Sequence, residues 1–221
     1  MMKTSNEDFK PIKNWFDKSV MNAAIKALRA RAFNADAYKD IAAVNRYLIR
    51  TIPKTATIGI PGSVTIRELG IIEKFKKRGN KIFQHWRSEL TEETDKDARR
   101  LEGSADFYLT SANAITIHGD IINIDGIGNR VASMIYGPGN VIIIAGINKI
   151  VRSIDEGIKR SKDIAGVMNA KRVGAETPCV KTGICVDCRV KRRICRVISI
   201  IQYRPWQTNI SVAIVAENLG F

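Results

Sequence analysis

The stretch NVIIIAG, residues 140–146, decides the fold class of this chain. It is apolar without alternation, which is typical of a strand buried on both faces, as in a parallel sheet covered by helices on either side. It is also too short to cross a bilayer, and the N-terminal residues MMKTSNEDFK contain no apolar run of the kind that a secretory leader needs. We therefore expect a helix-covered sheet in a cytoplasmic protein with no membrane span.

Short apolar segments alternate with amphipathic helices on the N-terminal side of this stretch. The predicted strands are ATIGI (56–60), NKIFQHW (80–86) and ADFYLT (105–110), and helices are predicted over residues 63–77 and 91–101. Thr91 is a suitable helix cap, and Ser153 with Glu156 forms a capping box for another helix. Strands that alternate with helices predict an α/β fold with three layers, in which a mainly parallel sheet is flanked by helices.

The two ends of the chain have patterns of their own. Residues 1–54 are predicted to form an N-terminal helical pair that packs on the core, because apolar residues recur at helical spacing over 12–33 and 37–50 before Pro53. Residues 55–221 are predicted to form the α/β domain. Near its end, RVISIIQY (196–203) and NISVAIVAE (209–217) predict two strands in a hairpin or a paired edge.

The chain is strongly basic, with a formal net charge of +14 and a pI near 9.8. This charge favours anionic partners such as nucleic acid, a membrane surface, a phosphorylated ligand or an acidic protein, and does not choose among them. Basic residues are spread along the chain, with a dense run, RVKRRICR, at 189–196. A solvated basic surface and a functional patch are both open at this point.

Two glycine-rich segments are candidates for a binding site. TIGIPGSVTIRELG (57–70) reads as a strand, a glycine turn and a helix that opens at Ser63, where backbone N–H groups can bind phosphate or carboxylate. Its spacing matches neither the dinucleotide motif nor the phosphate loop, so a tight turn capped by Ser63 is the competing interpretation.

The second segment, residues 110–139, places polar side chains among glycines. AITI (114–117) and IINI (121–124) are predicted to form a hairpin around the turn at 118–120, and a helix follows from residue 130. The polar groups outnumber what a turn requires, which favours a binding role. His85 and His118 each stand alone in the sequence, and a structural role is the simpler interpretation of both.

Several of these motifs, in this order, resemble the LUD family, the domain shared by lactate-utilization proteins B and C. They are GIPGSVTIRELG, TSANAIT, GDIINIDGIGNRVASMIYGP, VIIIAGINKIV, NAKR, TPCVKTGICVDC and RICRV. The chain is especially similar to stand-alone members with a four-cysteine C-terminal segment. The resemblance implies the fold of the ribose-5-phosphate isomerase, glucosamine-phosphate deaminase and CoA-transferase superfamily, an open and largely parallel sheet with a ligand site at the strand ends.

The resemblance also implies which residues form the ligand crevice. Asp125 is a candidate general base and Lys149 a candidate electrostatic clamp, although either side chain could instead hold a loop in place. The implied ligand-binding residues are Gly62, Ser63, Val64, Asn113, Asp125, Gly126, Gly128, Asn129, Arg130, Asn148 and Lys149.

All four cysteines fall within residues 177–196, which we call the cysteine segment: Cys179, Cys185, Cys188 and Cys195. Four thiolates can hold a tetrahedral Zn²⁺ ion or an iron–sulfur cluster, and the spacing matches neither common ferredoxin pattern. Basic neighbours would offset the charge of either centre. Because lactate-utilization systems work with iron–sulfur proteins, the resemblance modestly favours an iron–sulfur cluster over zinc; free thiols or paired disulfides are the alternative.

Three functions remain open at this stage. The sequence does not decide whether the chain is itself an enzyme or whether it forms a homo-oligomer. The first is a role in lactate-type organic-acid oxidation or a related redox pathway, with a small anionic ligand, a four-cysteine metal centre and redox protein partners. The second is a transferase or isomerase acting on a CoA ester or sugar phosphate, with a structural metal. The third is a zinc-dependent nucleic-acid module, whose affinity would fall steeply with salt. The scarcity of aromatic residues near the cysteines, with only Tyr203 and Trp206 close in sequence, makes nucleic acid the least favoured partner.

Overall fold

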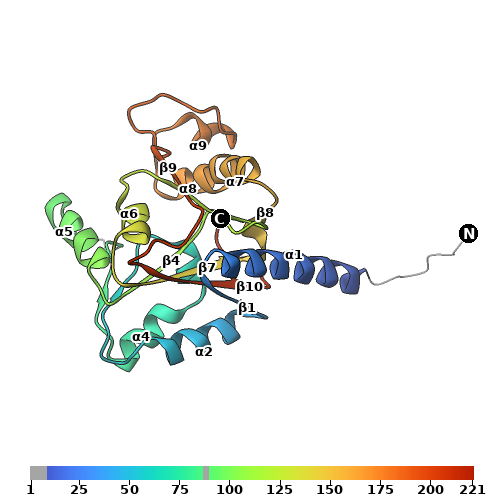
Figure 1. Ribbon diagram of the computed structural model, residues 1–221. Helices are drawn as coiled ribbons and strands as arrows, with labels where there is room; N and C mark the ends of the chain where they lie inside the picture. Colours follow the sequence, from blue (N-terminus) through green and yellow to red (C-terminus); the bar gives the residue numbers. More distant parts are fainter. Residues whose placement is uncertain (1–8, 87–89) are drawn as a thin grey trace, which may run out of the picture.

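A computed structural model of the chain describes residues 9–86 and 90–221 (Figure 1). The N-terminal residues in which we expect no leader thus lie largely outside the described part. Within it, six strands form one sheet, and every neighbouring pair is parallel. This confirms the predicted α/β fold with a mainly parallel sheet. In spatial order the strands are β1 (Asn34–Tyr38), β10 (Asn209–Val215), β7 (Asn140–Gly146), β4 (Phe107–Ser111), β2 (Ile58–Gly59) and β3 (Ile82–Phe83).

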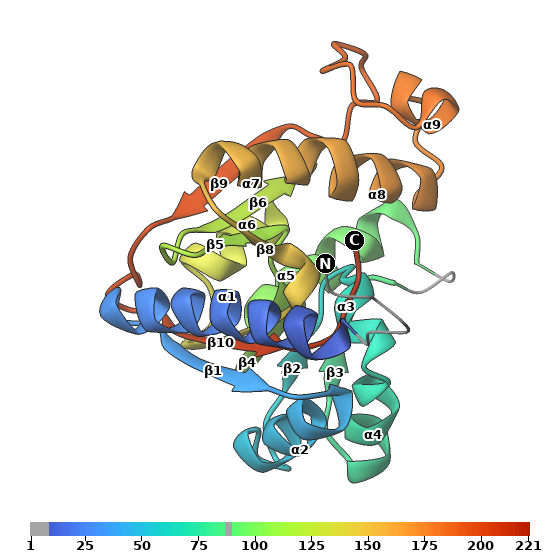
Figure 2. The same cartoon turned by 90° about the vertical axis from the view of Figure 1, so that its right-hand side faces the viewer.

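Strand β7 is buried on both faces, as its unbroken apolar run predicts. Val141 and Ile143 belong to a core cluster under α1 (Lys10–Ala30), whereas Ile142 and Ile144 face α2 (Ile41–Thr51) and α4 (Ile71–Arg78) on the opposite side. Figure 2 shows α1 on one side of the sheet and α2 and α4 on the other. These positions of β7 are at most 2% exposed, and the sheet is the middle of three layers.

A smaller sheet lies on the α1 side of the large one. Its order is β8 (Ile150–Val151), β5 (Ala114–Thr116), β6 (Ile121–Asp125) and β9 (Val197–Ile201). β5 and β6 form the predicted antiparallel hairpin, and Gly119 supplies a left-handed φ of 87° in its turn. A long helix packs on this sheet, consisting of α7 (Ile154–Arg160), a π-helical stretch (Ser161–Gly166) and α8 (Val167–Arg172).

The predicted helix starts at Thr91 and Ser153 are confirmed. The Thr91 hydroxyl accepts from the Thr94 N–H at the start of α5 (Glu92–Gly103), and the Ser153 hydroxyl accepts from the Glu156 N–H at the start of α7. The other helical elements are α3 (Val64–Glu68), α6 (Asn129–Ile135), a 3-10 turn (Ile147–Lys149) and α9 (Pro178–Thr182). Over the described ranges, no helix combines the length and apolarity needed to span a membrane.

The predicted pairing of the two C-terminal strands is wrong. β9 pairs antiparallel with β6 in the small sheet, whereas β10 lies between β1 and β7 in the large one. Residues 202–208 therefore connect two sheets instead of closing a hairpin. The partner of each strand is set by tertiary packing, which a local apolar pattern does not contain.

Two predicted helices also differ from the structure. The helix over 63–77 is two helices, α3 and α4, because Gly70 adopts a left-handed φ of 61° between them. The second N-terminal helix begins at Ile41 instead of residue 37, because the Asp40 carboxylate caps the Ala43 N–H at 2.7 Å and residues 34–38 form β1. The domain boundary at residue 54 stays a prediction, and β1 ties the N-terminal segment to the large sheet.

Candidate functional site

A cavity of about 350 Å³ opens at the carboxyl ends of three neighbouring strands. The turn after β2 contributes residues 61–65, the end of β4 contributes residues 111–113, and the turn after β7 contributes Lys149. The β6–α6 loop and the long helix of α7 and α8 form the remaining walls. This position agrees with the general rule for open α/β sheets, in which ligands bind beyond the carboxyl ends of the strands. We call this cavity the crevice.

Most of the predicted ligand-binding residues line the crevice, but two do not. Gly128 is absent from the wall and adopts a left-handed φ of 94° just before α6. The Asn148 side chain accepts from the Leu219 N–H at 3.1 Å and so holds a neighbouring segment instead. The predicted residues that do line the crevice are Gly62, Ser63, Val64, Asn113, Asp125, Gly126, Asn129, Arg130 and Lys149.

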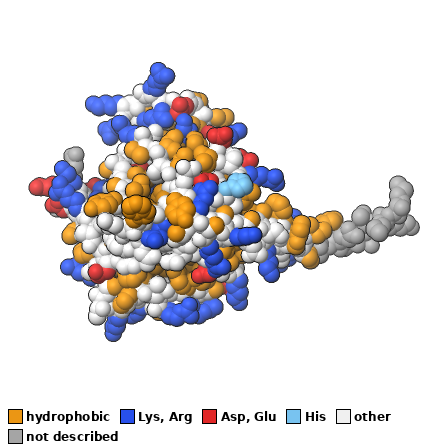
Figure 3. Space-filling model, viewed as in Figure 1, with side chains coloured by type: hydrophobic (Ala, Val, Ile, Leu, Met, Phe, Trp, Pro, Cys, Tyr) orange, Lys and Arg blue, Asp and Glu red, His pale blue; other side chains and the backbone are white. Residues whose placement is uncertain are grey.

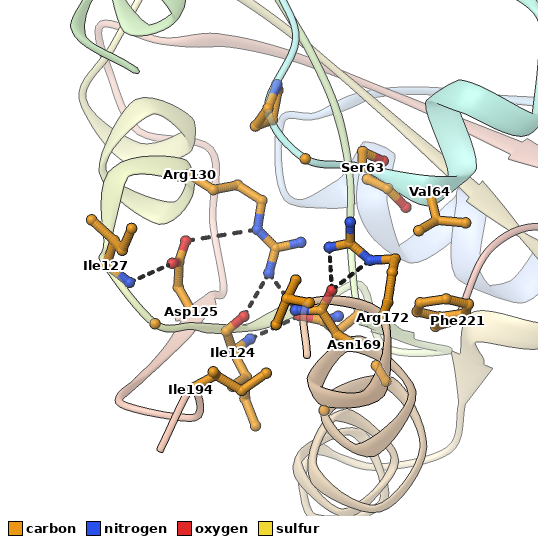
Figure 4. Close-up of a pocket in the computed structure, with 18 of the residues that line it drawn as sticks. Ser63, Val64, Ile124, Asp125, Ile127, Arg130, Asn169, Arg172, Ile194 and Phe221 are labelled. Carbon is orange, nitrogen blue, oxygen red and sulfur yellow. Dashed lines mark hydrogen bonds and ion pairs between the residues drawn. The ribbon is translucent and has the colours of Figure 1, made fainter. Parts of the chain in front are cut away.

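The Asp125 carboxylate holds the loop that leads into α6. Its Oδ1 accepts from the N–H groups of Ile127 and Gly128, and its Oδ2 accepts from the Val131 N–H at 3.3 Å. Arg130 lies nearby, with its Nε 3.8 Å from Oδ2 (Figure 4). These are the contacts of a turn-forming carboxylate. A general-base role for Asp125 stays a prediction.

Arg130 is held in position by neighbouring oxygen atoms. Its Nη2 donates to Asn113 Oδ1 at 2.9 Å and to the Ile124 carbonyl at 2.6 Å. Figure 4 shows the guanidinium groups of Arg130 and Arg172 directed into the same cavity from opposite walls. The crevice therefore presents fixed positive charge to a ligand.

Lys149 is almost completely buried, with 3% of its surface exposed. Its Nζ atom donates to Thr65 Oγ1 at 2.8 Å and to Ser111 Oγ at 2.9 Å. The pKa of Lys149 is lowered from 10.5 to about 7, mainly by burial and in part by the nearby Arg160 and Arg130, while Glu68 acts in the opposite direction. The neutral amine form of this lysine is therefore favoured relative to that of an exposed lysine.

Trp86 lies between two arginines, an arrangement that the sequence analysis did not predict. The guanidinium carbon of Arg172 is 4.0 Å from the Trp86 ring centroid, and that of Arg67 is 4.2 Å from it. Burial lowers the pKa of Arg172 to about 10, and Arg67 adds to this effect. In the sequence, the NAKR motif at 169–172 is the one signal for this wall of the crevice, because the motif ends with Arg172.

His85 also lines the crevice and belongs to a buried hydrogen-bonded network. Its Nδ1 lies 2.7 Å from Glu102 Oε1, and its Nε2 lies 3.0 Å from Arg99 Nη1. Because a guanidinium group only donates, Nε2 accepts and Nδ1–H donates to the carboxylate. Asp95 in turn pairs with Arg99 at 2.8 Å. In the sequence His85 stood alone; the fold gives it an orienting carboxylate and a place on the crevice wall.

The four cysteines line one small cavity beside the crevice and form no disulfide. Burial raises the pKa of Cys195, and so do the other three thiols. Among the described residues, however, no three His, Cys, Asp or Glu side chains lie close enough together to hold a single metal ion. Four thiols are the donor set that either an iron–sulfur cluster or a tetrahedral zinc ion uses, so the predicted four-cysteine metal centre stays a prediction.

Basic side chains surround this second cavity. Figure 3 shows Lys and Arg gathered on the part of the molecule where Figure 1 places α9 and the cysteine segment. Arg193 holds the segment together, donating to the carbonyls of Cys188 and Cys195 at 2.7 Å each and pairing with Asp187 at the same distance. Lys162 of the π-helical stretch also pairs with Asp187, at 3.1 Å. The segment is thereby tied to the long helix.

The crevice and the cysteine cavity share a wall. Gly166, Ile194 and Cys195 line both of them. A Cβ atom at Gly166 would lie 3.1 Å from Cys195 Sγ, and one at Gly126 would lie 2.9 Å from the Ile194 carbonyl oxygen, so the two regions are in close contact. The Arg196 N–H also donates to the Asp125 carbonyl at 3.0 Å. The sequence did not predict this proximity.

Together these features define an α/β protein with a cationic crevice at its strand ends and a second cavity, lined by four thiols, beside it. The family model of the LUD domain matches residues 8–215, and the chain belongs to this family. This confirms the resemblance seen in the sequence motifs, and at the family level it supports a protein related to lactate utilization.

A solved structure has a similar fold. The crystal structure of a DUF162 family protein from Deinococcus radiodurans aligns with a TM-score of 0.52 at 12% sequence identity. The alignment covers 90% of this chain and 98% of the other. At this identity the similarity concerns the fold alone. No curated protein sequence matches the chain.

Proposed function

We propose that this LUD-family protein binds a small organic acid in the crevice and holds an iron–sulfur cluster on Cys179, Cys185, Cys188 and Cys195. Its role would be in lactate-type organic-acid oxidation or a related redox pathway with protein redox partners. The observation that carries the proposal is the wall shared by the two cavities, in which Cys195 faces both. A ligand in the crevice would thus lie next to one of the four thiols.

The charge and size of the crevice support a small anionic ligand. Arg130 and Arg172 line it, and the Asp125 carboxylate is already engaged by backbone N–H groups. A volume of about 350 Å³ lies at the small end of ligand pockets. Guanidinium groups bind carboxylates through paired, charge-assisted hydrogen bonds, so a carboxylate ligand fits this lining.

Four thiols around one cavity can hold an iron–sulfur cluster or a tetrahedral zinc ion. The chain belongs to the LUD family, which is related to lactate utilization, and because lactate-utilization systems work with iron–sulfur proteins, this favours the cluster. When bound, an iron–sulfur cluster supplies one-electron chemistry, at a potential set by its charge, its hydrogen bonds and its exposure. Arg193 and Lys162 would contribute positive charge near it.

Metal analysis of protein purified without oxygen tests this proposal. We expect a brown protein with about four irons per chain, and a colourless protein after Cys185→Ser and Cys188→Ser are introduced together. Lys181→Ser is the matched control, because it changes an exposed residue of the same segment and leaves every thiol in place. A colourless wild-type protein with one zinc per chain would contradict the cluster. It would favour the alternative function, a transferase or isomerase with a structural metal.

A further inference from the structure

Lys149 is a buried amine with no carboxylate partner. Its hydrogen-bond partners are the hydroxyl groups of Thr65 and Ser111, and it forms no ion pair with a carboxylate among the described residues. A lysine with a purely structural role is usually paired when it is this deeply buried. Its position on the crevice wall, at the carboxyl end of the central strand, is where a ligand would meet it.

The backbone at Gly220 packs closely against this amine. A Cβ atom built on Gly220 would lie 3.2 Å from Lys149 Nζ and 2.3 Å from Thr65 Oγ1, so only a glycine leaves room here. Gly220 also has a left-handed φ of 60°, which other residues rarely adopt. The amine is therefore held in a fixed position between α3, β4 and the segment around Gly220, on the wall of the crevice.

Burial and nearby charges keep this amine partly neutral. Burial has the largest effect, Arg160 and Arg130 also oppose protonation of the amine, and Glu68 favours its protonation. Together these effects bring the pKa of Lys149 to about 7. A neutral amine carries the lone pair that attacks a carbonyl carbon. Lysine nucleophiles are usually activated by desolvation or by a neighbouring cation, both of which favour the neutral amine. At neutral pH a large fraction of Lys149 is in this reactive form.

We propose that Lys149 forms an imine with a 2-oxo acid bound in the crevice. The lysine nitrogen attacks the carbonyl carbon, a C=N bond replaces the C=O bond, and the carbonyl oxygen leaves as water with the two amine protons. The hydroxyls of Thr65 and Ser111 lie beside the nitrogen and can donate to that oxygen, while Arg130 attracts the carboxylate. This inference rests on the proposed function, because a 2-oxo acid is the oxidised partner of a 2-hydroxy acid such as lactate.

Reductive trapping tests the imine directly. Purified protein is incubated with pyruvate, reduced with borohydride, digested and mapped by mass spectrometry. We expect one reduced pyruvate adduct per chain, on Lys149, with a yield that rises as the pH passes through about 7. Lys149→Met should lose the adduct, whereas Lys159→Met, the same change at an exposed lysine, should retain it.

The mapping in wild-type protein keeps the test decisive even if Lys149→Met fails to fold. An absence of adduct at saturating pyruvate, or adducts spread over exposed lysines in equal yield with and without Lys149, would overturn the proposal. Iron content is measured on the same samples. An iron-loaded protein without an adduct would refute the imine alone, and an adduct on iron-free protein would refute the cluster alone.

Discussion

The large sheet and the cysteine segment are built by different means. In β7 and β10, apolar residues are buried on both faces of the sheet, and Ile143 and Ile214 have no exposed surface. Within residues 177–196, all of which are described, Thr177 is the one buried residue, and Ile184 is 67% exposed. The sheet is therefore stabilised by the hydrophobic effect, whereas the cysteine segment is held by polar contacts, to which the proposed cluster would add.

The largest expected effect of this difference concerns the thiols. Amide hydrogen exchange in residues 177–196 should be about a hundredfold or more faster in the variant with Cys185→Ser and Cys188→Ser than in the iron-loaded wild type. The reason is that metal binding supplies local folding energy. Exchange in β7 and β10 should stay within a fewfold of wild type. Equal protection of the segment in both proteins would show that polar contacts alone order it.

A pair of isoleucine substitutions compares the two regions by stability. Ile143→Ala should lower the free energy of unfolding by about 2–5 kcal/mol, because it leaves a cavity in the core. Ile184→Ala should change it by less than about 0.5 kcal/mol, as expected for an exposed position. Urea denaturation followed by circular dichroism measures both. Similar losses for the two variants would mean that the cysteine segment has a core that the structure does not show.

Lys149 is a polar exception inside the well-buried region. Its pKa in the folded chain, about 7, lies below its ordinary value of 10.5, so the unfolded chain binds the proton more tightly. The free energy of unfolding should therefore rise as the pH increases from about 7 to 10, by on the order of 2–3 kcal/mol.

Lys149→Met should lose this gain, and Lys159→Met should keep it. Denaturation midpoints measured at several pH values provide the comparison. A wild-type curve parallel to that of Lys149→Met across this pH range would contradict the depressed pKa.

A small effect on stability is expected at the shared wall. A Cβ atom at Gly166 would lie 3.0 Å from the Ser161 carbonyl oxygen and 3.1 Å from Cys195 Sγ. Gly166→Ala should change the free energy of unfolding by less than about 1 kcal/mol, since alanine favours the helix while the added methyl crowds its neighbours.

The same variant should visibly alter the absorption spectrum of the cysteine centre, because the methyl group presses on Cys195. Met168→Ala, on an exposed part of the same helix, should leave the spectrum unchanged. A Gly166→Ala spectrum that cannot be distinguished from wild type would place the centre away from this wall.

The sequence predicted the sheet better than it predicted the site. The run NVIIIAG predicts a doubly buried strand because burial on both faces requires apolar residues at every position. NADAY, residues 34–38, gives no such signal: β1 is an edge strand in which Ala35 is the one buried residue, so β1 was missed. The partners of β9 and β10 depend on contacts between distant segments, and the predicted hairpin was wrong for that reason.

The candidate site follows the same pattern. Most residues that the resemblance and the glycine turns indicated line the crevice, whereas Gly128 and Asn148 do not, and a ligand-binding role for any of them stays a prediction. His85 and Trp86 follow β3, whereas Arg172 is the last residue of α8, so the two parts of this wall meet only in the folded chain. The proximity of Cys195 to the crevice depends on the packing of the cysteine segment against the long helix, which no local spacing encodes.

Electron paramagnetic resonance of the reduced, iron-loaded protein during titration with pyruvate tests the central claim most directly. If the crevice and the cysteine centre form one site, the cluster spectrum should change saturably with pyruvate. The titration midpoint should shift by about tenfold or more in Arg172→Gln, as the loss of a charge-assisted contact would cause. Calorimetric evidence that pyruvate binds, combined with a cluster spectrum that stays unchanged at saturation, would contradict the account.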